Sequence, residues 1–222
     1  MTPRALIVDW GGVLTPGVPD AMREWAASEG LDVAALRDAF GPWHDPDEAR
    51  PGSGLAGTIE LMERGEVDPA QVERVLADRL SRAGGRAVPA EGLLARMFSF
   101  FTHAEDMAAL VRRAHRIGIA TALLSNSWGD HYPDHLWDGT FDVVVLSGEV
   151  GMRKPDPAIF LHTVALLGVP AAECVFVDDL PPNVAAAVDL GMIGVIHRDY
   201  EQTADELCVL FDRDLRASEV VG

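Results

Sequence analysis

The sequence predicts an α/β protein with a doubly wound parallel sheet and a helical cap inserted after the first strand. Five short, largely apolar segments each end in polar or turn residues. This pattern is typical of strands that are buried on both faces of a parallel sheet. Segments with helical character lie between strands, and the alternation predicts helices on both faces of the sheet.

The first of the expected strands is the N-terminal segment Ala5–Val8. The others are Ile119–Leu124, Phe141–Leu146, Cys174–Val177 and Ile193–Ile196. Ligand sites in sheets of this kind lie beyond the carboxyl ends of the strands. The polar residues that follow the strands are therefore expected to share one site, and they are Asp9, Ser125, Asn126, Asp178 and Asp179.

The long segment between the first two strands has no strand pattern. Its helices are expected at Asp20–Glu29, Val33–Phe40, Thr58–Arg64, Pro69–Ser81 and Glu91–Phe101. Asp68 suits an N-cap and Pro69 suits the first helical position. The stretch Gly41–Gly57 is rich in Gly, Pro and Asp, so we expect a loop there.

The remaining helices are expected among the later strands, at Ala104–Arg116, Ala158–Leu167 and Asn183–Leu190. We expect residues 1–16 and 97–222 to form the α/β core. Residues 17–96 are expected to form the cap, folded over the strand ends.

The composition excludes several classes of function. The chain has 222 residues, enough for one core and a modest second unit, and its net charge is −17. Such an acidic protein is not expected to bind nucleic acid or an anionic membrane surface. Cys174 and Cys208 are far apart, which argues against a disulfide framework and a zinc site. With no signal peptide or long apolar run, we expect a cytoplasmic protein, either a monomer or a homodimer.

The polar residues at the strand ends suggest phosphoryl chemistry. Asp9 is placed to act as a nucleophile, and Ser125 with the backbone N–H of Asn126 can donate hydrogen bonds to an anion. Lys154 is the only lysine beside 17 arginines, and it supplies a compact positive charge.

Three acids at one sheet edge would repel one another unless a cation lay between them. Asp9, Asp178 and Asp179 offer hard oxygen ligands without His or Cys, and this donor set selects Mg²⁺.

Four motifs in this order resemble those of the haloacid dehalogenase-like superfamily. They are Asp9-Trp10-Gly11-Gly12-Val13-Leu14, Leu123-Leu124-Ser125-Asn126, Gly151–Pro157, and Val177-Asp178-Asp179 with Asn183 following. The resemblance covers the whole chain, because the helical insertion matches the cap domain of that superfamily. The chain looks closest to the branch that includes the N-terminal phosphatase domain of soluble epoxide hydrolases and bacterial sugar-phosphate phosphatases.

The resemblance implies a phosphatase for a small phosphorylated metabolite. Asp9 would attack phosphorus and form an aspartyl-phosphate. Ser125, the Asn126 N–H and Lys154 would bind the phosphate oxygens, so that Asp9, Ser125 and Lys154 are the expected catalytic residues.

The resemblance also implies a magnesium cofactor. Asp9, the main-chain carbonyl of Gly11 and Asp179 would bind the ion, with Asp178 binding directly or through water. Bound there, Mg²⁺ would neutralise charge and align the phosphoryl group.

Gly11 departs from the pattern of the superfamily, which usually has a second Asp there as general acid and base. A missing acid–base group costs on the order of 10²–10⁴ in rate. His44, His131 and His135 are candidate replacement donors, although each is more simply explained as a surface histidine.

Two other functions remain open. One is a metal-independent 2-haloacid dehalogenase in which the Asp nucleophile attacks carbon, although the adjacent pair Asp178-Asp179 argues for a metal. The other is a phospho-ligand binding module whose catalysis is weakened by Gly11. Retention of Asp9 argues against it, because binding alone would not need a nucleophile.

Overall fold

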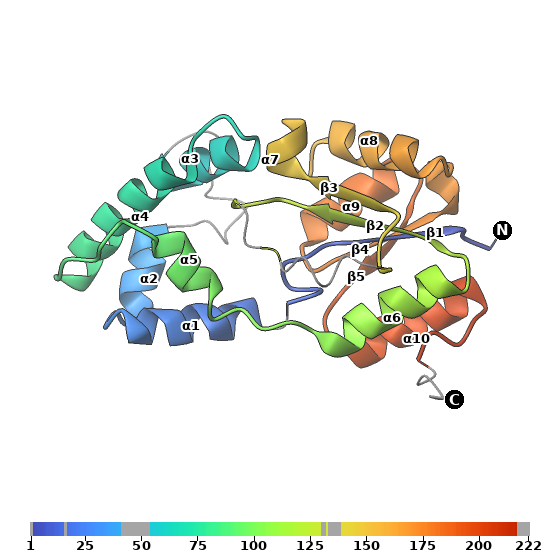
Figure 1. Cartoon of the computed structure of the whole chain (residues 1–222), viewed down its shortest axis with the longest axis horizontal. Coiled ribbons are helices and arrows are strands. Elements are labelled where there is room, and N and C mark those ends of the chain that lie inside the picture. The colour runs from blue at the N-terminus through green and yellow to red at the C-terminus, as the bar shows by residue number, and fades with distance from the viewer. Residues whose placement is uncertain (1, 16, 41–53, 130–131, 133–138, 217–222) are drawn as a thin grey trace.

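The computed structural model describes residues 2–15, 17–40, 54–129, 132 and 139–216, and its centre is a five-stranded parallel sheet. The strand order is β3-β2-β1-β4-β5 (Figure 1). The strands are β1 (Ala5–Val8), β2 (Ala120–Ser125), β3 (Val143–Leu146), β4 (Cys174–Asp178) and β5 (Ile193–Ile196). The predicted doubly wound parallel sheet is confirmed.

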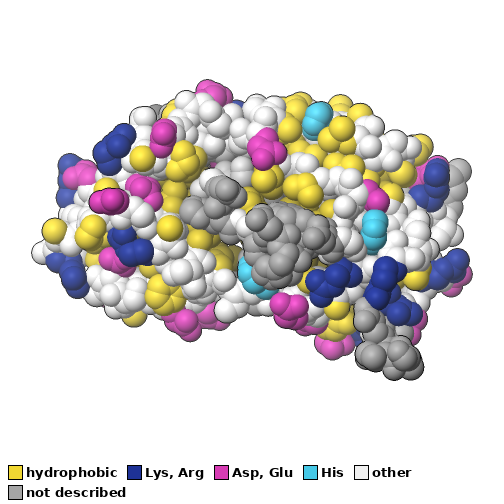
Figure 2. All heavy atoms as spheres, in the orientation of Figure 1, with side chains coloured by type: hydrophobic (Ala, Val, Ile, Leu, Met, Phe, Trp, Pro, Cys, Tyr) yellow, Lys and Arg dark blue, Asp and Glu magenta, His cyan; other side chains and the backbone are white. Residues whose placement is uncertain are grey.

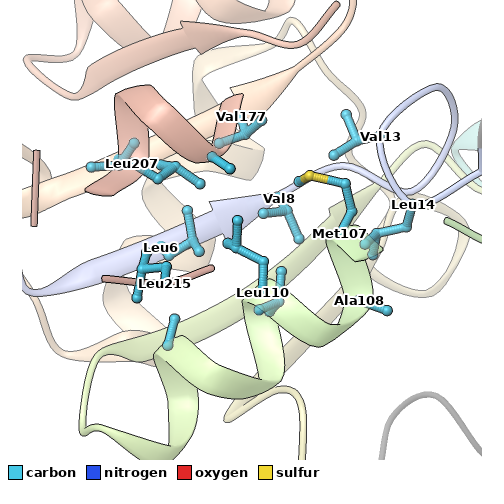
Figure 3. Close-up of a cluster of buried hydrophobic side chains, with 14 of the residues drawn as sticks. Leu6, Val8, Val13, Leu14, Met107, Ala108, Leu110, Val177, Leu207 and Leu215 are labelled. Carbon is cyan, nitrogen blue, oxygen red and sulfur yellow. The ribbon is translucent and has the colours of Figure 1, made fainter. Parts of the chain in front are cut away.

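One face of the sheet is covered by α6 (Glu105–Arg116) and α10 (Tyr200–Phe211) (Figure 1). Successive side chains of a strand point to opposite faces, so Leu6 and Val8 of β1 face these helices. Figure 3 shows them packed among side chains from α6, the end of β4 and α10. Helix α10 begins at an N-cap, because the Asp199 side chain accepts a hydrogen bond from the backbone N–H of Gln202 at 2.8 Å.

The opposite face is covered by α8 (Pro157–Leu167) and α9 (Pro181–Asp189). Ala5 and Ile7 of β1 point to this side, where α8 contributes Ile159 and Phe160. The short helices α7 (Ser147–Val150) and η3 (Ala171–Glu173) lie in the connections on either side of α8.

The cap consists of α1 (Val18–Ser28), α2 (Val33–Phe40), α3 (Gly54–Glu63), α4 (Pro69–Gly84) and α5 (Leu93–Phe98). These helices lie beyond one end of the sheet (Figure 1) and share a buried cluster around Trp25. The predicted N-cap of α4 is confirmed, since the Asp68 side chain accepts from the Ala70 N–H at 2.7 Å. The cluster also contains Met97, so the exact boundary of the cap at residue 96 stays a prediction.

Several element boundaries differ from those predicted. Helix α3 begins at Gly54, so the end of the predicted loop Gly41–Gly57 is helical, while residues 41–53 lie outside the described ranges. Helix α5 spans only Leu93–Phe98, and it begins after Gly92, which adopts φ 66°. Helix α10 was not predicted at all.

The surface is charged on both units. Figure 2 shows Asp and Glu side chains spread over the cap and the core of this face, with hydrophobic side chains gathered over α8. Two of the exposed hydrophobic residues of α8 are Leu161 and Leu166. Within the described part of the chain, none of the helices is both long and apolar enough to cross a membrane.

Candidate active site

Strand register brings the predicted site residues to one edge of the sheet. Val8 pairs with Leu123 of β2 on one side and with Val177 of β4 on the other. The residues that follow these three positions therefore lie side by side, which places Asp9 between the ends of β2 and β4. The backbone N–H of Asp9 extends the pairing by donating to the Val177 carbonyl at 3.0 Å.

Lys154 lies between two carboxylates in the interior. Its Nζ is 2.7 Å from Oδ1 of Asp9 and 2.7 Å from Oδ2 of Asp178, and the residue is 1% exposed. Burial by itself would lower the pKa of Lys154, but the carboxylates of Asp178 and Asp9 outweigh it, and the pKa is raised. The lysine is therefore held as a cation next to the predicted nucleophile.

The Asp178 carboxylate accepts hydrogen bonds from three groups: the Lys154 amine, the Leu180 N–H and the Asn183 amide. The Asn183 amide nitrogen lies 3.0 Å from Oδ1 and 3.1 Å from Oδ2, and the Leu180 N–H donates to Oδ1 at 2.8 Å. With Lys154 on Oδ2, both oxygens have partners. Asn183, known from the sequence only as a motif residue, fixes the carboxylate that supports the lysine.

Asp9 presents one carboxylate oxygen to its neighbours. Oδ1 contacts Lys154 Nζ and also accepts the Trp10 N–H at 2.7 Å, whereas no described residue hydrogen-bonds to Oδ2. Burial raises the pKa of Asp9 well above its usual range. Lys154 counteracts this rise, and the charges of Asp178 and Asp179 add to it. An added cation would therefore favour the ionised form that a nucleophile needs.

Asp9, Asp178 and Asp179 form a cluster suited to a metal ion. Each offers a carboxylate oxygen, and these oxygens lie within 4.8 Å of one another. Burial and the neighbouring Asp178 raise the pKa of Asp179 to about 6. An all-oxygen set of this charge fits Mg²⁺. The ion would also relieve the repulsion that, together with burial, raises the pKa values of Asp9 and Asp179.

The two glycines after Trp10 have different surroundings. Gly12 has φ 75°, and a Cβ added there would overlap the Asp179 carboxylate, so only glycine fits. Gly11 has no such constraint, because an added Cβ would meet no atom within 4 Å. Space for a side chain is thus present where the usual acid is missing. His44, His131 and His135, the candidate replacement donors, lie outside the described residues.

Ser125 and Asn126 lie at the end of β2. Ser125 is 2% exposed, and its Oγ is 2.9 Å from the Tyr132 hydroxyl. The Asn126 side chain accepts the Lys154 N–H at 2.8 Å and donates to the Lys154 carbonyl at 3.0 Å. Sequence reasoning assigned a phosphate-binding role only to the Asn126 backbone and did not find that its side chain holds the lysine loop.

Glu63 connects the cap to the loops of the site. It ends α3 and is 4% exposed, and its carboxylate accepts from Trp128 Nε1 at 2.7 Å and from Arg153 Nε at 2.6 Å. Trp128 lies three residues after Ser125, and Arg153 precedes Lys154. A buried cap carboxylate therefore contacts both the loop after β2 and the loop that carries Lys154. Sequence reasoning missed this contact because the partners are distant in the chain.

The chain is similar to several known proteins. A family model described as haloacid dehalogenase-like hydrolase matches residues 3–191. The sesquiterpene phosphatase astK of Aspergillus oryzae is 30% identical over 159 residues, which cover 68% of this chain and 77% of that protein. The chain spans only 23%, 18% and 38% of the length of three other curated relatives that it matches.

Two solved structures share the fold. A HAD family enzyme from Bacteroides thetaiotaomicron, in complex with magnesium and inorganic phosphate, has TM-score 0.62 and 22% identity, with 90% of this chain and 98% of that chain covered. An L-2-haloacid dehalogenase has TM-score 0.60 and 20% identity, with coverage of 98% and 92%. The match of the family model over most of the chain confirms the resemblance: the chain belongs to the haloacid dehalogenase-like hydrolase family, and it is a hydrolase.

Proposed function

We propose that the protein is a Mg²⁺-dependent phosphatase that hydrolyses a small phosphomonoester through an aspartyl-phosphate on Asp9. The observation that carries this proposal is the cluster of Asp9, Asp178 and Asp179, of which Asp9 and Asp178 contact the buried amine of Lys154. A carbon-directed nucleophile would not need three carboxylates at one point, whereas phosphoryl transfer uses a cation to balance them.

Asp9 is the proposed nucleophile, through Oδ2. Lys154 and the Trp10 N–H both contact Oδ1, so the other oxygen can approach phosphorus while the carboxylate stays oriented. In the first step an Asp9 O–P bond forms, the bond from phosphorus to the leaving alkoxide breaks, and the alkoxide takes up a proton from solvent water. In the second step a water oxygen attacks phosphorus and the Asp9 O–P bond breaks. The protons of the water leave with inorganic phosphate or pass to solvent, and the Asp9 carboxylate is regenerated.

The remaining residues act on the phosphate. Ser125 and the Asn126 N–H would donate to its oxygens, and Lys154 would offset charge as it develops in the transition state. Asn126 also holds the backbone of Lys154 through its side chain, so the donors at the end of β2 and the lysine keep a fixed relation.

The proposed magnesium ligands are Asp9, Asp179, the Gly11 carbonyl and Asp178, directly or through water. Bound there, Mg²⁺ would neutralise phosphate charge and orient the phosphoryl group. Asp178 already has hydrogen bonds on both oxygens, whereas Asp9 and Asp179 have raised pKa values that a cation would lower.

Gly11 limits the substrates that react quickly. With no carboxylic acid at this position, a leaving group that needs a proton in the transition state is disfavoured. We expect aryl phosphates to react faster than alkyl phosphates. The net charge of −17 disfavours nucleic acid, and a small phosphorylated metabolite is the proposed ligand, bound by a monomer or homodimer.

Release of inorganic phosphate from a panel of sugar phosphates, nucleotides and aryl phosphates tests the proposal. Activity should require Mg²⁺ and should be lost in Asp9→Asn, which keeps the shape of the side chain. Asp38→Asn, at an exposed position of α2, is the matched control and should behave as the unchanged protein. A protein that folds and binds Mg²⁺ but hydrolyses no member of the panel would contradict the proposal.

Structural similarity to an L-2-haloacid dehalogenase keeps a second function in view. That enzyme class uses the same kind of Asp nucleophile without a metal. If the protein released halide from a 2-haloacid in the presence of EDTA, the reaction would be attack of Asp9 at carbon and not phosphoryl transfer. Binding of phosphate without turnover of any substrate would instead indicate a binding module.

A further inference from the structure

We propose that Tyr132 is a positioning residue that orients the Ser125 hydroxyl so that its hydrogen points to the bound phosphate. The proposal rests on the proposed phosphatase function and adds a residue to its phosphate site. It starts from the distance of 2.9 Å between the Tyr132 hydroxyl and Ser125 Oγ. Tyr132 lies in the connection between β2 and β3, seven residues after the serine.

A serine hydroxyl has a single hydrogen and two lone pairs, so it donates in one direction at a time. If Ser125 donated to Tyr132, its hydrogen would not be available to a phosphate oxygen. The productive arrangement is the reverse, in which the phenol donates to Ser125 Oγ and Ser125 donates to the phosphate. Hydrogen bonds linked in this way polarise and strengthen one another.

Two features keep the phenol in the donating form. Burial raises the pKa of Tyr132, and the nearby Asp9 adds to the rise, so that the O–H stays protonated at neutral pH although the bond to Ser125 lowers the pKa somewhat. Ser125 itself is almost fully buried, so water does not compete freely for its oxygen.

The Tyr132 ring packs against Trp10, which lies just after the end of β1. Its centroid lies 5.4 Å from that of Trp10 in an edge-on arrangement, and Trp10 lies 5.4 Å from His103. Because Trp10 directly follows Asp9, Tyr132 contacts the end of β1 with its ring and the end of β2 with its hydroxyl. This double contact relates the position of the serine donor to that of the nucleophile.

Tyr132→Phe is the informative variant, because it keeps the ring and removes only the hydroxyl. We expect binding of inorganic phosphate in the presence of Mg²⁺, measured by calorimetry, to weaken about 5- to 10-fold, as for the loss of one hydrogen bond. The chain has one other tyrosine, Tyr200 at the start of α10, and Tyr200→Phe is the matched control with no expected change.

A double-mutant cycle separates positioning from general support of the fold. In a Ser125→Ala background the hydroxyl of Tyr132 has no serine to orient, so Tyr132→Phe should change phosphate affinity by less than about 2-fold. An equal loss in both backgrounds would show that Tyr132 acts independently of Ser125 and would overturn the proposal.

The readouts distinguish this inference from the proposed function. If the unchanged protein neither hydrolyses an aryl phosphate nor binds inorganic phosphate, the phosphatase proposal fails and the role of Tyr132 fails with it. If the unchanged protein does both and Tyr132→Phe matches it in phosphate affinity, only the role of Tyr132 is overturned.

Discussion

The core and the cap contribute to the site in different ways. In the core, strand register places Asp9 and Asp178 side by side, and the backbone itself sets their separation. The cap is built from helices around Trp25 and contacts the site loops through a side chain, that of Glu63. The reacting groups therefore depend on the sheet, whereas the attachment of the cap depends on a few long-range polar contacts. Changes in the core should therefore have larger effects than changes at the cap contact.

Among variants that keep the proposed nucleophile Asp9, the largest effect is expected from Lys154→Arg. The substitution keeps the charge, but the planar guanidinium cannot replace a compact ammonium that is 1% exposed between two carboxylates. We expect kcat/KM for a phosphomonoester to fall by about 10²–10³, as for the loss of a preorganised charge-stabilising group. Arg64→Lys, an exchange of the same two residue types in the cap, serves as the control and should leave kcat/KM unchanged. Near-normal activity of Lys154→Arg would remove the lysine from the mechanism.

Gly11→Asp should act in the opposite direction. The added side chain has room, and it would supply the acid–base group that the site lacks. For alkyl phosphates with poor leaving groups we expect kcat to rise by on the order of 10², and for aryl phosphates by much less.

Two alanine variants control this prediction. Gly11→Ala should leave rates near those of the unchanged protein, whereas Gly12→Ala should impair Mg²⁺ binding, because its Cβ would overlap the Asp179 carboxylate. An equal gain for both substrate classes in Gly11→Asp would argue against proton transfer as the cause.

Magnesium affinity should depend on pH through Asp179. Its pKa is raised to about 6, so the carboxyl is ionised above that pH and carries a proton below it. Mg²⁺ must displace this proton, and affinity should therefore fall about 10-fold per unit as the pH decreases below 6. Calorimetric titration of Mg²⁺ between pH 7 and pH 5, without phosphate, measures the effect. A constant affinity over this range would exclude Asp179 as a ligand.

The smallest effect is expected at the cap contact. Glu63→Gln keeps the shape of the side chain but removes the charge that faces Arg153, which lies 2.6 Å away. We expect the free energy of unfolding to fall by about 1–3 kcal/mol and KM to rise about 3- to 10-fold, with kcat changed less.

Arg153→Met changes the other partner of this contact and completes a double-mutant cycle with Glu63→Gln. If Glu63 acts through Arg153, the two substitutions together should cost clearly less than the sum of the single effects. Additive losses would show that the ion pair contributes little to cap attachment.

Much of the core could be predicted because its central strands β1, β2 and β4 are buried on both faces. The predicted strand Cys174–Val177, for example, is one residue shorter than β4. Helix α10 was missed even though its buried residues Ala204, Leu207 and Phe211 recur at helical spacing after the cap Asp199, a signal that the sequence does contain.

The contacts that complete the site were harder to predict. The strand ends indicated Asp9, Ser125 and Asp178, because polar residues after buried strands share one sheet edge. Glu63 and Arg153 are 90 positions apart, and their contact depends on how the cap docks, which no local pattern specifies. The pairing of Tyr132 with Ser125 likewise depends on side-chain direction within a connection.

The single lysine gives this protein a built-in chemical reporter. Reagents that modify side-chain amines can react at Lys154 and at no other side chain, and the amine is buried between its two carboxylates. The rate of its modification therefore measures how often the interior of the site becomes accessible to solvent. If Mg²⁺ or phosphate slows this modification, the rate reports how much of the site is occupied. The measurement uses the unaltered protein and needs no introduced probe.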